Sequence, residues 1–349
     1  MAVVPAPTWA ITRGERSSSM PATKSITGRA RMAQGLASVP SSAALRKPAS
    51  RRMISQASGR SLLAALDVEH PEWRPLLALI EAASREAERP HWVRFVPTPG
   101  HDGCDGRPFL DGAVIAVAPK LVERWVRHLL ALAAEAGTEV QPLGKAVAAG
   151  WLDPSLLFEA ALSQDVDRFH EIARVERDYR GVLRGLASLI AMPMLQACRR
   201  AWAERVPTSW AYGYCPVCGG WPSLAEIRGL DGARHLRCGC CGSDWRTEWL
   251  RCPFCGESDH EKLGSLVSPD GLERHAIEVC DGCRGYLKTF TTLTAIRPGD
   301  LLLEDLATLA LDMAALERDY RRPAARGCAV AVGVVAEPWR LRDLLSLRL

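Results

Sequence analysis

The 349-residue sequence predicts an α+β protein with an N-terminal helical bundle, two tandem cysteine-rich modules and a C-terminal helix. Apolar residues recur at helical spacing from about residue 61 to 210. The composition changes at Tyr212, where Gly, Cys and short alternating runs replace the helical pattern until about Phe290. Helical spacing then returns over Asp300 to Arg321 and stops before Pro323, because proline cannot continue a helix.

These changes divide the chain into four segments. Residues 1–60 are rich in Ser, Ala, Arg and Pro and poor in acidic residues, which predicts a disordered basic arm or a mis-assigned start. A targeting segment is the alternative interpretation of that arm. Residues 61–210 form the expected helical domain, 211–290 the cysteine-rich domain, and 291–349 the C-terminal helix and tail.

About six helices are expected in the helical domain. The segments with helical spacing run from Ser61 to Asp67, Trp73 to Ala87, Lys120 to Ala136, Pro154 to Leu162, Val166 to Tyr179 and Val182 to Val206. Turn-rich stretches separate them, as expected for a bundle of helices.

The net charge and the distribution of apolar residues restrict the class of protein. The net charge of +4 is weak for this length, so it does not by itself indicate a nucleic-acid partner. No run of about 18 apolar residues is present, so no membrane span is expected. The N-terminus lacks an apolar stretch of signal-peptide length, which favours the cytoplasm.

Eight of the twelve cysteines lie in four CxxC pairs, an arrangement typical of metal ligation. We expect two four-thiolate sites with sequential pairing, which uses Cys215, Cys218, Cys238 and Cys241 in one site and Cys252, Cys255, Cys280 and Cys283 in the other. An interleaved pairing stays open. Between the pairs of each site the sequence predicts a hairpin, from Pro222 to Arg237 in the first and from Leu263 to Val279 in the second.

All-sulfur sites suit Zn²⁺ or rubredoxin-type iron, and the spacing does not distinguish between them. Each site is closed by four protein thiolates, which argues against a metalloenzyme, so no catalytic or cofactor-binding residues are assigned. A redox dithiol is the alternative for a single CxxC pair. Cys240 is expected to be a bystander or an outer-shell thiol. The isolated cysteines Cys104, Cys198 and Cys328 are expected to be small buried residues.

Positive charge close in sequence is expected to offset the thiolates. The candidates are Arg234, Arg237, Arg246 and Arg251. Beside the last CxxC pair, we expect Asp281, Tyr286 and Lys288 to be exposed.

The cysteine-rich segment resembles the formate dehydrogenase accessory protein family, FdhE. The resemblance is carried by Tyr214–Gly220 (YCPVCGG), His235–Trp245 (HLRCGCCGSDW), Arg251–Gly256 (RCPFCG), Glu278–Lys288 (EVCDGCRGYLK) and the helix at Glu304–Asp312. It extends over residues 60–327, more loosely in the helical region. Cys240 and the N-terminal arm depart from the family pattern.

The resemblance implies a non-catalytic cytoplasmic maturation factor. Such a factor binds the catalytic subunit of respiratory formate dehydrogenase before its export. The resemblance also ranks iron ahead of zinc at both sites, and a homodimer is left open. Two rival functions remain. A zinc-ribbon nucleic-acid binder would use Trp221, Trp245 and Trp249 with nearby arginines, and a rubredoxin-like electron carrier would cycle its iron.

Overall fold

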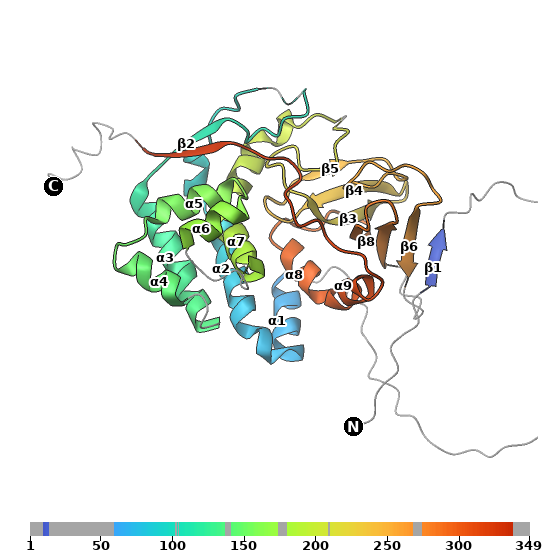
Figure 1. Ribbon diagram of the computed structural model, residues 1–349, viewed down its shortest axis with the longest axis horizontal. Helices are drawn as coiled ribbons and strands as arrows, with labels where there is room; N and C mark the ends of the chain where they lie inside the picture. Colours follow the sequence, from blue (N-terminus) through green and yellow to red (C-terminus); the bar gives the residue numbers. More distant parts are fainter. Residues whose placement is uncertain are drawn as a thin grey trace, which may run out of the picture.

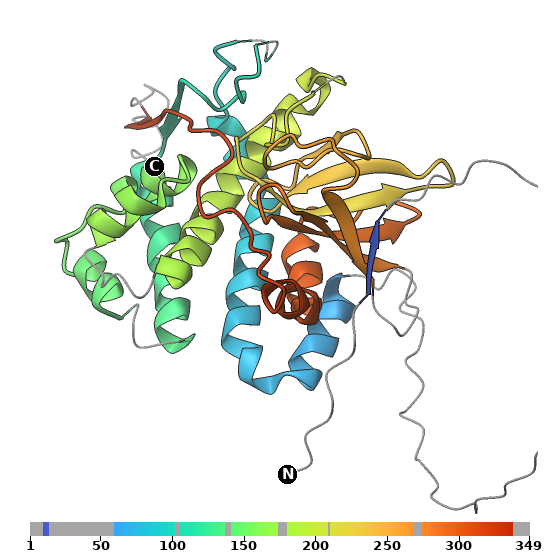
Figure 2. The same cartoon turned by 45° about the vertical axis from the view of Figure 1, so that its right-hand side comes forward.

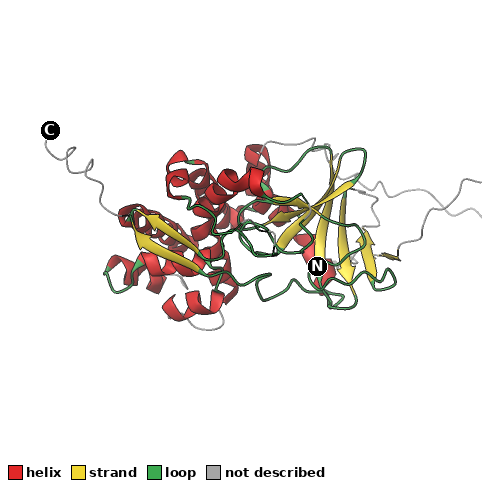
Figure 3. Cartoon of the chain, turned by 90° about the horizontal axis from the view of Figure 1, so that it is seen from above, coloured by secondary structure: helices red, strands yellow, loops and turns green. Residues whose placement is uncertain are grey.

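The computed structural model describes residues 10–13, 59–101, 103, 105–136, 141–173, 180–208, 210–267 and 274–337. Helices come first, then a seven-stranded sheet, and then two short helices and a strand that returns to the helical part (Figure 1). Viewed from above, the helical part and the sheet lie side by side (Figure 3). The predicted order of helices, cysteine-rich modules and C-terminal helical segment is confirmed.

Six helices occupy the expected segments: α1 Gly59–Glu69, α2 Arg74–Glu88, α3 Pro119–Ala136, α5 Pro154–Leu162, α6 Val166–Ala173 and α7 Arg180–Trp202. A further helix, α4 Gln141–Ala148, was not expected, since it buries only Leu143 and Val147 and its apolar period is short. The start of α5 follows from its sequence, because the carboxylate of Asp153 accepts a 2.8 Å hydrogen bond from the amide of Ser155.

Helix α7 lies at the centre of the helical part (Figure 2). It contacts α2, α3, α5 and α6, and Ile190, Met194, Leu195 and Cys198 on it are fully buried. The same apolar core continues into the first cysteine-rich module, where it includes Cys215, Leu236 and Trp245. The helices therefore support the first module directly.

The sheet has the strand order β1-β6-β7-β8-β3-β4-β5. Its first module supplies β3 Pro222–Arg228, β4 Ala233–Cys238 and β5 Asp244–Arg246, and its second supplies β6 Leu263–Val267, β7 His275–Cys280 and β8 Tyr286–Thr292. Both expected hairpins are present as antiparallel pairs, β3 with β4 and β6 with β7. The residues 268–273 of the second turn lie outside the described part of the chain.

A parallel pairing joins the two modules. Strand β3 runs beside β8, with the register Leu224 to Lys288 at one end and Arg228 to Thr292 at the other. The modules are consecutive in sequence but share a single sheet, which the expectation of two tandem ribbons did not include.

Strand β1 comes from the segment that was expected to be a disordered arm. Ala10–Arg13 pairs antiparallel with β6 at the edge of the sheet. The expectation for the segment is thus not met at these four residues, while residues 1–9 and 14–58, with Met20, Met32 and Met53, lie outside the described residues.

The C-terminal helix is divided into α8 Leu301–Ala307 and α9 Leu309–Leu316, where a single helix over Asp300 to Arg321 was expected. The break falls at Thr308, whose hydroxyl donates to the carbonyl of Glu304 at 2.8 Å. The two helices cover the sheet, and a second apolar core forms between them. Its sheet side includes Leu266, Ile277 and Phe290, and its helix side Leu301, Leu311 and Ala315.

A second, two-stranded sheet lies at the helical end of the molecule (Figure 3). Strand β2 Ala113–Val117 pairs in parallel with β9 Val332–Ala336, which belongs to the C-terminal tail. Across the described residues, no helix is both long and apolar enough to cross a membrane.

Candidate metal centres

Each CxxC pair forms the same tight turn. The amide of the first cysteine donates to the carbonyl five residues later, at 2.8 Å for Cys215 to Gly220, 2.9 Å for Cys238 to Ser243, 2.8 Å for Cys252 to Glu257 and 3.0 Å for Cys280 to Gly285. The residue after the second cysteine has a positive φ, 73° at Gly219, 74° at Gly242, 79° at Gly256 and 56° at Arg284. Glycine occupies this position in three of the four turns, because it adopts this conformation without steric strain.

The turns meet in two groups of four cysteines. Their Sγ atoms lie within 4.8 Å of one another in each group, Cys215, Cys218, Cys238 and Cys241 in the first and Cys252, Cys255, Cys280 and Cys283 in the second. The grouping is the sequential one, and the interleaved alternative is not adopted. Cys240 belongs to neither group.

The spacing of the sulfurs fits a tetrahedral metal ion. The Sγ atoms of Cys215 and Cys241 are 3.5 Å apart, and those of Cys252 and Cys283 are 3.7 Å apart. Metal–sulfur bonds of 2.3 Å in a tetrahedron place the sulfurs about 3.8 Å apart. A disulfide needs about 2.05 Å, and all eight thiols are free. Only cysteines enter either group in the described part of the chain, so the donor sets suit zinc or iron.

The two groups differ in burial. The cysteines of the first are all 0% exposed, whereas Cys255 and Cys283 of the second are exposed. Burial raises the pKa of Cys215 well above its usual value. Hydrogen bonds from Cys215 and Cys218 lower the pKa of Cys238 to about 5.

The helical part contacts the first group through Gln164, between α5 and α6. Its Nε2 donates to the carbonyl of Cys218 at 2.7 Å, and its Oε1 lies 3.5 Å from Sγ of Cys240. Cys240 is therefore next to the group without belonging to it. Sequence reasoning missed Gln164, because it lies 54 residues before Cys218 and in no motif.

The arginines expected to offset the thiolates have other partners. Nη2 of Arg234 lies 2.5 Å from the carboxylate of Glu278, and Arg237 pairs with the buried Glu226. Arg251 is 4.0 Å from Glu248, and Arg246 is exposed. For Arg234 and Arg237 the expectation is wrong, because carboxylates of the same sheet take up their charge.

Arg199 on α7 is the cation that sequence reasoning missed near the first group. Burial lowers its pKa, and the Cys241 thiolate acts in the opposite direction. Its Nε has no hydrogen-bond partner among the residues that the structure describes. Arg199 therefore interacts electrostatically with Cys241 of the first group.

The residues beside the last CxxC pair are not the exposed group that was expected. Lys288 is 0% exposed and Tyr286 is 4% exposed. Nζ of Lys288 lies 2.7 Å from the carboxylate of Asp312 and 2.6 Å from that of Asp305, on the two C-terminal helices. Asp281 is half-buried and accepts from the hydroxyl of Tyr320 at 2.6 Å. Lys288 and Tyr286, whose hydroxyl donates to Asp312 at 2.8 Å, therefore hold the two C-terminal helices against the sheet, and Asp281 contacts the segment after α9.

The isolated cysteines also differ from one another. Cys198 is fully buried, as expected. Cys328 is half-exposed, and its amide donates to the carbonyl of Gly219 at 2.9 Å, so the C-terminal segment pairs with the first turn. Cys104 lies outside the described residues.

Fold and site together define a helical protein that carries two closed four-cysteine modules in one sheet. Residues 250–327 match the model of the FdhE C-terminal domain. An FdhE homolog of Edwardsiella ictaluri is 30% identical over 293 residues, which cover 79% of this chain and 87% of that protein. The chain belongs to the FdhE family.

Other relatives match over a shorter stretch. An FdhE homolog of Pseudomonas aeruginosa is 40% identical over 114 residues, 31% of this chain and 37% of that protein. One from Aquifex aeolicus is 30% identical over 149 residues, 40% of this chain and 51% of that protein. The match thus spans only about a third to a half of these two relatives. The crystal structure of the FdhE protein from Pseudomonas aeruginosa aligns with 24% identity and a TM-score of 0.48, over 79% of this chain and 95% of that chain.

Proposed function

We propose that this protein is a cytoplasmic maturation factor that binds the catalytic subunit of a respiratory formate dehydrogenase before its export. Membership of the FdhE family supports the proposal. The protein is not a catalyst in this proposal, because each four-cysteine group leaves no open coordination position for a substrate.

The eight cysteines of the two groups are proposed to hold one metal ion each, iron in preference to zinc. The observation that supports this most strongly is the pair of compact four-thiol groups, with sulfurs 3.5–3.7 Å apart. A bound ion would stabilise the turns, since Cys255 and Cys283 of the second group are exposed and receive little support from burial.

The alternative function, nucleic-acid binding, is not supported, because most of the residues expected to contact the nucleic acid are buried. Trp245 is 3% exposed, and Arg234 and Arg237 are 1% and 2% exposed. Of the three tryptophans proposed for such a face, Trp249 is the most exposed, at 54%. A stacking surface of tryptophans and arginines is therefore not available from these residues.

Co-purification tests the proposal. A tagged protein is expressed anaerobically in a host that makes a respiratory formate dehydrogenase, and the recovered proteins and metals are quantified. We expect wild type to recover the catalytic subunit and about two metal ions, and Cys215→Ser/Cys218→Ser to lose both the subunit and the first ion.

Two further variants sharpen the result. Cys328→Ser changes a cysteine outside both groups and is expected to behave as wild type. Cys255→Ser/Cys283→Ser alters the exposed group and is expected to keep the first ion with a native circular dichroism spectrum. Recovery of nucleic acid, or of no dehydrogenase subunit by wild type, would contradict the proposed function.

A further inference from the structure

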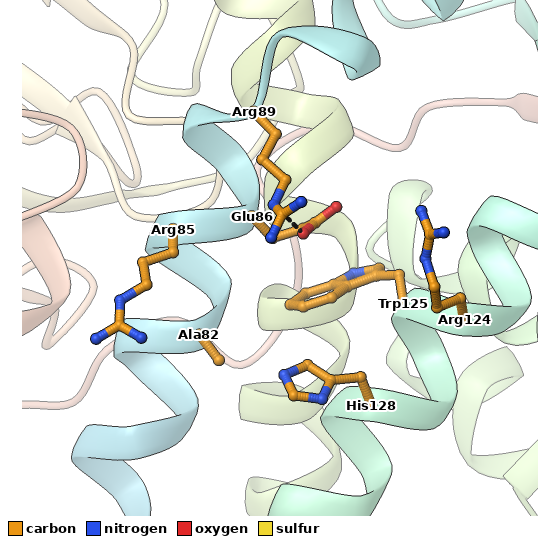
Figure 4. A pocket seen from close by; sticks show the side chains of 7 residues that line it. All are labelled: Ala82, Arg85, Glu86, Arg89, Arg124, Trp125 and His128. Atoms are coloured by element: carbon orange, nitrogen blue, oxygen red, sulfur yellow. Dashed lines mark ion pairs between the residues drawn. The ribbon is translucent and has the colours of Figure 1, made fainter.

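A cavity of about 350 Å³ opens between α2 and α3, away from both cysteine groups (Figure 4). Its volume is within the usual range for small-molecule sites. Three arginines and one glutamate are among the residues that line it, which are Ala82, Arg85, Glu86, Arg89, Arg124, Trp125 and His128. The lining therefore carries an excess of positive charge.

The carboxylate of Glu86 is already occupied. Its Oε1 accepts from Nε1 of Trp92 at 3.0 Å and lies 3.1 Å from Nε2 of His91. Its Oε2 is 3.1 Å from Nε of Arg89, the pair drawn as a dashed line in Figure 4. Glu86 thus holds the short 3₁₀ helix Pro90–Phe95 against α2, and its charge is shared with donors of the protein itself.

Two arginines on the lining stay available to bind a ligand. Arg124 is exposed and has no hydrogen bond or ion pair with any residue that the structure describes. Arg89 meets Glu86 through Nε, which leaves its terminal amino groups for another acceptor. Arg85 pairs with Glu81, so we do not count it as a ligand donor.

An aromatic wall completes the cavity. Trp125 and His128 project from α3 toward α2, and Glu86 and Arg89 lie above the Trp125 ring (Figure 4). The indole N–H of Trp125 is used internally, since it donates to the carbonyl of Ile190 at 2.9 Å. The ring therefore presents carbon atoms rather than a polar group to the cavity.

We propose that this cavity binds a phosphate group carried on a small organic molecule. Arg89 and Arg124 supply the forked donors that match phosphate oxygens, and the His128 ring supplies a further polar contact. Ala82 and Trp125 form the apolar wall against which the organic part packs. Both guanidinium groups are solvated, so the affinity is modest and falls as the salt concentration rises.

Isothermal titration calorimetry with inorganic phosphate and with adenosine monophosphate, at low ionic strength, tests the inference on the full chain. We expect saturable binding of both probes, tighter for the nucleotide because of its base. Arg124→Gln and Arg89→Gln are each expected to weaken binding about five- to tenfold. Arg124→Gln is the cleaner variant, because it breaks no described contact.

Charge-matched controls are available on the same helices. Arg74→Gln on α2 and Lys120→Gln on α3 remove one positive charge each and lie outside the cavity lining. They are expected to bind as wild type does. Equal weakening by the controls would mean that net charge alone attracts the anion, and absence of saturable wild-type binding up to about 10 mM would overturn the inference. Neither outcome bears on the formate dehydrogenase proposal.

Discussion

The side-chain amide of Gln164 donates a 2.7 Å hydrogen bond to the backbone carbonyl of Cys218, which joins the helical part to the first cysteine group. Gln164 has a φ of 53°, a conformation that L residues rarely adopt. The surrounding packing compensates for the backbone strain at Gln164, so its side-chain amide stays within reach of the Cys218 turn.

Removal of that amide should destabilise the protein. Gln164→Ala leaves the Cys218 carbonyl without its donor and is expected to lower the free energy of unfolding by about 1–3 kcal/mol. Gln164→Gly loses the same bond but relieves the positive φ, so it should be less destabilising than alanine by about 0.5–1 kcal/mol. Urea denaturation of the three proteins measures both differences, and an alanine variant as stable as wild type would contradict the role of the bond.

Gly219 and Gly256 occupy equivalent positions in the first and third turns but have different surroundings. A Cβ on Gly219 would lie 2.8 Å from the carbonyl oxygen of Cys328, whereas the nearest atom to one on Gly256 is at 3.9 Å, on Arg251. Gly256→Ala should therefore cost only the conformational strain, less the effect of a more restricted unfolded chain, about 0.5–1 kcal/mol. Gly219→Ala should cost more, because the C-terminal segment must also move. Thermal unfolding compares the pair, and equal losses would show that the contact with Cys328 is unimportant.

The unequal burial of the two cysteine groups predicts unequal release of metal. A chelator should empty the second group first, since Cys255 and Cys283 are exposed and the first group is fully buried. Alkylation during the release, followed by peptide mass spectrometry, should modify Cys255 and Cys283 before any cysteine of the first group. Simultaneous modification of Cys218 and Cys255 would rule out this order.

Acid should weaken the contact between the sheet and the C-terminal helices. Burial acts to raise the pKa of Asp305, but the positive charges of Arg322 and Lys288 outweigh it and hold this pKa below its usual value. A lowered folded-state pKa stabilises the protein above the unfolded pKa of about 3.9. That stability is lost as the pH falls through the lower folded value.

Asp305→Asn tests this dependence. The variant should lose about 1–3 kcal/mol at neutral pH and show a shallower decline of unfolding free energy below about pH 4. Asp231→Asn, at an exposed turn, serves as the control and should keep the wild-type profile. If the unfolding free energy of Asp305→Asn declined below about pH 4 as steeply as that of wild type, another carboxylate would be responsible for the acid sensitivity.

Much of the candidate site could be predicted because its geometry is local. A CxxC turn depends on four or five adjacent residues, and the first strands of the two hairpins, Pro222–Arg228 and Leu263–Val267, show their alternation within a few positions. The parallel contact of β3 with β8 has no such signal, since its strands are far apart in sequence. Lys288 was misjudged for the same reason: its partners Asp305 and Asp312 lie on later helices.

The pairing of β2 with β9 sets an order of events during synthesis. Ala113–Val117 leaves the ribosome roughly 220 residues before its partner Val332–Ala336. At an elongation rate of about 5–20 residues per second this interval lasts about 10–45 s. Through that time the edge of β2 has no strand beside it, so a nascent chain depends on its helices, or on a chaperone, until translation reaches the final strand.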